Sequence, residues 1–240
     1  MFTKVWRAVR DLLPFASRKA DRCIVCRGAI RGRFRKDAFG ICVCVDHAKS
    51  TVQCRWCTRL VARSLGCSVC KAAAIVDTQR AKLIFKEIAG WCSRQGLRFD
   101  PANVGFKLGG DIAGAGGTTN QHRLGVTESL LNVKDNGLRK VTVSVIPGMP
   151  EPLFRSVVAH ECVHVWTAIH RIRQTQVAEE GLAEVVSYLY VKSRRGLDYT
   201  VLARRMEKNP DPVYGSGFRS VQATVEYRGL RQYIRSLQAA

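Results

Sequence analysis

Residues His160 to His164 form the pattern HExxH, as the sequence HECVH. Side chains four residues apart lie on one face of a helix, so His160 and His164 can bind the same metal ion. Glu161 then lies beside the first ligand, where its carboxylate can act as general base towards a water molecule at the metal. The pattern predicts a catalytic zinc site on a helix.

A second acidic segment, EEGLAE at 179–184, supplies a candidate for the third ligand. Catalytic zinc is held by three protein ligands and keeps one position open. Glu180 follows His164 by sixteen residues, which allows a turn and a return along an antiparallel helix. Glu184, one turn later, is expected to hydrogen-bond the outer nitrogen of a ligating histidine. The alternative is an acidic helix face in solvent.

This ligand set predicts peptide-bond hydrolysis, in which Glu161 takes a proton from water and passes it to the leaving amine. Such a reaction needs a donor for the developing oxyanion. The candidates are His122, Tyr214 and Tyr227, although a structural role is the preferred interpretation of each. The strand expected at 141–146 could pair with an extended substrate.

Seven cysteines and one histidine form four closely spaced pairs ahead of this segment. They are Cys23/Cys26, Cys44/His47, Cys54/Cys57 and Cys67/Cys70. Without a secretion signal, such pairs indicate metal sites rather than disulfides. Four pairs provide two tetrahedral structural zinc sites with no open position. The prediction is therefore three zinc ions, two structural and one catalytic.

The spacing favours sequential use of the cysteine pairs, as in LIM domains, over the cross-braced arrangement of RING domains. Cys42 is an alternative ligand to Cys44, although Cys44 has the regular spacing to His47. Cys92 and Cys162 are interpreted as ordinary buried thiols.

The predicted fold class is α+β, a zincin-like domain with a small sheet and active-site helices that follows a LIM-like module. We expect a basic amphipathic helix at 1–20, the module at 21–74 and the peptidase domain at 75–240. A membrane-surface helix or an organelle-targeting peptide is an alternative for 1–20. Periodicity predicts helices at 76–93, 152–173, 176–194 and 218–237, and strands at 104–108 and 141–146. The Gly-rich stretch at 109–120 matches no phosphate-binding pattern and is expected to be a loop.

The formal net charge is +20 over 240 residues, and residues 1–70 carry fifteen Lys and Arg against four acids. This field favours acidic proteins or nucleic acid as partners, in addition to protein or peptide substrates. No apolar run is long enough to span a membrane and the N-terminal residues do not form a secretory signal, so we expect a cytoplasmic protein.

The order of these motifs resembles the plant LIM-domain peptidases of the "DA-one" type. The likeness rests on CVCVDH, CRWC and CSVC, then AHECVHVW, EEGLAEVVSYLY and VYGSGFR, and covers most of residues 23–235. It implies a zinc peptidase domain behind a LIM-like module, with metal ligands at His160, His164 and the Glu179–Glu180 pair. An acidic ubiquitin-interacting helix and a first LIM repeat are not evident, so ubiquitin dependence is not carried over. The competing hypothesis is a non-enzymatic adaptor that binds protein or nucleic acid through its basic Cys-rich half.

Overall fold

The computed structural model describes residues 21–62, 66–109, 124–132 and 137–239. The helix expected at 1–20, most of the Gly-rich loop and the candidate donor His122 lie outside these ranges. The described residues contain helices and three small sheets, which confirms the α+β class. None of their helices has the length and apolarity to cross a membrane.

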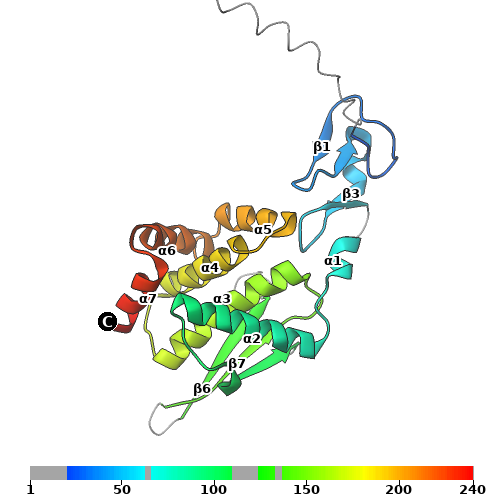
Figure 1. Cartoon of the computed structure of the whole chain (residues 1–240). Helices are drawn as coiled ribbons and strands as arrows, with labels where there is room; N and C mark the ends of the chain where they lie inside the picture. The colour runs from blue at the N-terminus through cyan, green and yellow to red at the C-terminus, as the bar shows by residue number, and fades with distance from the viewer. Residues whose placement is uncertain (1–20, 63–65, 110–123, 133–136, 240) are drawn as a thin grey trace, which may run out of the picture.

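The N-terminal part consists of two short hairpins. Strand β1 (Phe34–Lys36) pairs with β2 (Cys42–Cys44), and after the 3-10 helix η1 (Val45–Ser50), β3 (Thr51–Gln53) pairs with β4 (Leu60–Ala62). Helix α1 (Ser68–Ala72) closes this part, which projects from one end of the helical body (Figure 1). Ile75 exchanges backbone hydrogen bonds with Gly148 and Met149. These bonds hold the end of the cysteine-rich part beside the segment that leads into helix α3 (Glu151–His170).

The larger part contains a three-stranded sheet with the order β5-β7-β6, formed by β5 (Val104–Leu108), β6 (Gly125–Leu131) and β7 (Leu138–Val145). Strand β5 follows α2 (Thr78–Gln95) and the 3-10 helix η2 (Pro101–Asn103). The central strand β7 is parallel to β5 and antiparallel to β6. Its residues 141–145 are buried on both faces, as expected for a strand with neighbours on either side. Strand β6 has no fully buried residue, so no alternating pattern marked it in the sequence.

Five helices follow, namely α3 (Glu151–His170), α4 (Gln176–Lys192), α5 (Leu197–Glu207), α6 (Tyr214–Arg228) and α7 (Leu230–Ala239). Helices α2 and α3 lie against the sheet, α4 packs on α3, and α6 packs on α4 (Figure 1). Helix α5 was not predicted, and the single helix predicted at 218–237 is wrong. The chain is divided there at Gly229, whose φ of 82° ends α6.

One buried arginine connects three of these helices. Arg155 of α3 donates to Glu151 at 2.7 Å, to Glu87 of α2 at 2.8 Å and to the Tyr190 hydroxyl of α4 at 2.8 Å. Because the side chain is only 9% exposed, its charge needs these partners. The network therefore sets how α3 lies against its two neighbouring helices.

Two glycines allow α4 and α6 to approach closely. A Cβ atom on Gly181 would lie 2.4 Å from the carbonyl oxygen of Gly217, and one on Gly217 would lie 2.4 Å from the carbonyl oxygen of Val177. Both contacts are with backbone, which cannot move aside as a flexible side chain can. The glycines in EEGLAE and VYGSGFR are therefore required by helix packing.

The substitution Gly181→Ala tests this packing. We expect it to lower the free energy of unfolding by about 1–3 kcal/mol, because α4 and α6 must separate. Gly90→Ala on α2 is the matched control, since a Cβ there meets no atom closer than 3.8 Å. It should be neutral or stabilise by up to about 1 kcal/mol. Urea unfolding measures both, and equal stability of the two variants would contradict the packing account.

Candidate active site

Helices α3 and α4 bring three donor atoms to one point. Nε2 of His160 lies 3.2 Å from Nε2 of His164. Oε2 of Glu180 lies 3.1 Å from the first nitrogen and 3.5 Å from the second. The turn after α3 reverses the chain, so a residue on the first turns of α4 faces the histidine pair.

This arrangement suits a metal ion better than a hydrogen-bonded cluster. Oε2 of Glu180 is buried and has no hydrogen-bond partner among the described residues, although both imidazoles face it. Zinc bonds to nitrogen and oxygen of about 2.0–2.1 Å, arranged as a tetrahedron, separate the ligand atoms by about 3.3 Å. The three distances lie around that value, so these residues fit zinc.

The outer nitrogens of both histidines contact carboxylates. Nδ1 of His160 is 3.2 Å from Glu184, and Nδ1 of His164 is 2.9 Å from Glu179. The Thr167 hydroxyl donates to the same Glu179 oxygen at 2.8 Å. Such partners fix the tautomer and the ring orientation of a ligating histidine. The helical spacing predicted this role for Glu184 alone, and the family resemblance placed Glu179 with Glu180 at the metal. In the structure Glu179 contacts Nδ1 of His164 instead.

The surrounding carboxylates change the pKa values of the histidines. Burial alone would lower the pKa of His160, but Glu180 and Glu184 outweigh it and hold that pKa well above its usual value. Burial also acts to lower the pKa of His164, but the carboxylates of Glu179 and Glu180 outweigh it and raise that pKa to about 9. Although burial favours its neutral form, Glu180 has a pKa well below the usual value because both imidazoles face it. A metal ion at this site would compete with protons for the imidazoles.

Glu161, the predicted general base, is buried beneath β6. Thr127 of β6 donates its hydroxyl to Oε2 of Glu161 at 2.7 Å. A Cβ atom on Gly125 would lie 2.8 Å from Oε1 of Glu161, so this glycine leaves space for the carboxylate. Sequence reasoning missed both β6 residues because β6 itself was not expected. They position the carboxylate on the side of α3 that faces the cavity.

A cavity of about 990 Å³ lies over these groups. Residues of β6, α3, α4 and α5 line it, including His160, Glu161, His164 and Glu180. Its wall also contains apolar side chains such as Leu131, Leu138 and Leu153. Its size and mixed lining are typical of a cleft that binds a small ligand or a short peptide.

The structure places two of the three candidate oxyanion donors, since His122 lies outside the described residues. Tyr214, at the start of α6, lines the cavity, with its ring centroid 6.3 Å from that of His160. Tyr227 was a wrong candidate, because it is 88% exposed and lies thirteen residues along α6, about 20 Å from Tyr214. The assignment of β7 as the substrate-pairing strand is also wrong, since β7 is paired on both edges. Among the described residues, β6 is the strand that lines the cavity and has one unpaired edge.

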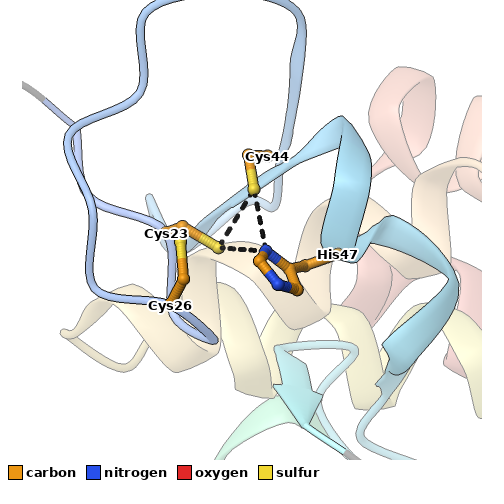
Figure 2. A group of neighbouring side chains, drawn as sticks. All are labelled: Cys23, Cys26, Cys44 and His47. Carbon is orange, nitrogen blue, oxygen red and sulfur yellow. Dashed lines mark hydrogen bonds between the residues drawn. The ribbon is translucent and has the colours of Figure 1, made fainter.

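The first cysteine cluster joins Cys23, Cys26, Cys44 and His47, whose ligand atoms lie within 4.8 Å of one another. Figure 2 shows the four side chains grouped in space, with Sγ of Cys44 3.6 Å from Sγ of Cys23 and 3.0 Å from Nδ1 of His47. Cys42 is excluded from the group, and its thiol donates to the Gly40 carbonyl. The cluster could bind zinc through Cys44 rather than Cys42.

The second cluster joins Cys54, Cys57, Cys67 and Cys70, all buried. This grouping corresponds to sequential use of the pairs. Backbone N–H groups donate to Sγ of Cys23 and of Cys54, each at 3.4 Å. Although burial raises the pKa of both thiols, backbone hydrogen bonds, the strongest from Cys26 to Cys23 and from Cys57 to Cys54, lower the pKa to about 6 in each. Thiolates stabilised in this way are suited to bind metal. Cys92 and Cys162 are completely buried, as expected.

Comparison with known proteins points to one family. The model of the DA1-like family, described as "Protein DA1", matches residues 117–201, a range that includes HECVH and EEGLAE. The Arabidopsis thaliana protein DA1 is 23% identical over 125 residues, which is 40% of this chain and 24% of that protein. The rice LIM domain-containing protein HDR3 is 24% identical over 133 residues, 40% of this chain and 26% of the relative. No solved structure matches the chain.

These matches confirm the resemblance to the DA1 type that the sequence motifs predicted. The aligned part spans only about a quarter of each curated relative, so the activity of the whole relatives does not transfer directly.

The ligand set makes a quantitative prediction for the three glutamates of α4. Glu180→Ala should weaken zinc binding most, because it removes a donor atom. Glu179→Ala and Glu184→Ala should each weaken it by about 10–100-fold, because they only orient the imidazoles. Competition with a chromophoric chelator measures the affinities, and Glu226→Ala on the exposed surface of α6 serves as control. Unchanged zinc affinity in Glu180→Ala would remove this residue from the ligand set.

Proposed function

We propose that this protein is a zinc-dependent peptidase that hydrolyses peptide bonds in a limited set of protein substrates. The observation that carries the proposal is the convergence of His160, His164 and Glu180 at one point, beside a buried glutamate and an open cavity. This combination of ligands and base, in an HExxH helix with a glutamate from the next helix, is that of a gluzincin-like site. The resemblance to DA1-type proteins supports the same class.

The residues of the chain have separate roles in this reaction. A zinc ion bound by His160, His164 and Glu180 would polarise the scissile carbonyl and make water more acidic. Glu161 takes the proton from the attacking water and delivers it to the leaving amine. The Thr127 hydroxyl holds the Glu161 carboxylate in place, which limits its rotation towards other rotamers. Tyr214 is the remaining described candidate for a donor to the oxyanion.

The cysteine-rich part would bind two structural zinc ions and brace the peptidase body. Arg59, five residues after Cys54, forms an ion pair with Asp198 of α5 at 2.8 Å and lies over the ring of Phe39. The Trp56 carbonyl, between two cysteine ligands, accepts a hydrogen bond of 2.7 Å from Arg205 of α5. Since Arg205 also lines the cavity, the second cluster supports one wall of the active site.

Replacing the base tests the proposal. Glu161→Gln keeps the size of the side chain and removes the proton acceptor, so kcat/KM should fall by at least about 100-fold while zinc stays bound. Glu128→Gln is the matched control, because Glu128 is an exposed residue of β6 that does not line the cavity. Cleavage of a quenched-fluorescent peptide library and elemental analysis give the two readouts. Near-normal cleavage by Glu161→Gln would contradict the mechanism.

If no zinc-dependent cleavage is found with any peptide while both cysteine clusters are filled, the adaptor hypothesis replaces the peptidase.

A further inference from the structure

Two arginines, Arg171 and Arg173, lie in the wall of the cavity, in the turn between α3 and α4. Arg171 ends α3 in the left-handed conformation, with a φ of 55°, and both side chains are exposed. Neither guanidinium group makes an ion pair or a hydrogen bond with another described residue, in contrast to those of Arg155 and Arg59. Their guanidinium groups are therefore available to a ligand in the cavity.

The carboxylates that line the same cavity already face other groups of the protein. Glu161 accepts from Thr127, and Glu179 contacts His164 and Thr167. Glu180 and Glu184 face the histidines. The third arginine of the wall, Arg205, donates to the Trp56 carbonyl. The positive charge of Arg171 and Arg173 is thus not compensated by a described acidic side chain of the wall.

The position of Arg171 and Arg173 relative to the metal ligands indicates which residue of a bound peptide they would face. Arg171 follows His164 by seven residues, two helical turns, so it lies on the same side of α3 and about 10 Å further along its axis. An extended peptide advances about 3.3 Å per residue. The arginines would therefore face a side chain about three residues from the scissile bond.

We propose that the cavity selects peptides with an acidic side chain about three residues from the scissile bond, whose carboxylate binds Arg171 and Arg173. The proposal rests on the proposed peptidase function for the position of that bond. Guanidinium groups bind carboxylates through paired N–H donors, which gives directional preference over a neutral amide. The net charge of +20 would add long-range attraction for acidic proteins but would not select a position in the peptide.

Binding to the Glu161→Gln protein measures this preference without turnover. The probes are fluorescent peptides that carry Asp, Asn or Lys at each position from two to four residues on either side of a central dipeptide. We expect Asp to bind about fivefold more tightly than Asn at one position, as for a solvent-accessible ion pair. Fluorescence anisotropy gives the dissociation constants at fixed salt.

Variants identify the residues responsible. Arg171→Gln/Arg173→Gln should remove the preference for Asp over Asn, and Arg171→Glu/Arg173→Glu should reverse it in favour of Lys. The matched control is Arg195→Glu/Arg204→Glu, which makes the same change in net charge at two exposed residues outside the cavity. This control should lower the affinity for all acidic peptides equally and keep the position dependence.

Equal affinity for Asp and Asn peptides at every position, or the same response in the cavity and control variants, would overturn the inference. Cleavage by the unmodified protein then separates the two proposals. Efficient zinc-dependent cleavage that ignores Asp leaves the peptidase and removes the acidic preference. Position-specific binding of Asp peptides without any cleavage supports the arginine site and removes the peptidase.

Discussion

The candidate site depends on one constraint, that three donor atoms from two helices lie about 3.3 Å apart around a common point. Oε2 of Glu180 is buried without a hydrogen-bond partner among the described residues, although Nε2 of His160 and Nε2 of His164 face it. A cation at their centre would offset the free-energy cost of burying that oxygen, and such a site requires that α3 and α4 keep their spacing. Much of the surrounding structure serves to keep it. The Arg155 network holds α3 in position. The close contact of Gly181, the residue after Glu180, with Gly217 holds α4 against α6.

The same constraint explains why segments distant in sequence belong to one unit. Helix α6 carries the VYGSGFR glycine that packs on α4, and its first residue, Tyr214, reaches the cavity. Strand β6 supplies the hydroxyl that holds Glu161. Trp56, within the second cysteine cluster, accepts a hydrogen bond from Arg205 of α5, and Arg205 also lines the cavity. The structure thus links the cysteine-rich part to the cavity without placing any of its ligands there.

The sequence predicted the elements whose pattern is local. HExxH and the return to Glu180 needed only helical spacing, the cysteine pairs needed only their separations, and the α2 and α3 helices followed from periodicity. The residues that it missed act through contacts between elements. Glu179 differs from Glu180 only by the face of α4, Thr127 lies on a strand that has no buried residue, and Tyr227 could be rejected only once the length of α6 was known. The central position of β7 in the sheet could not be predicted either, because it follows from pairing with β6, which was not expected.

Anomalous diffraction at the zinc edge, from crystals of the full chain grown with zinc, tests the central claim most directly. The account predicts three peaks per chain. Two should lie within the cysteine clusters and the third between His160, His164 and Glu180. The third peak should be lost in Glu180→Ala, while both others remain. Peaks at the two cysteine clusters only, with the imidazoles of the native protein bonded to carboxylates instead, would contradict the catalytic site and with it the proposed peptidase.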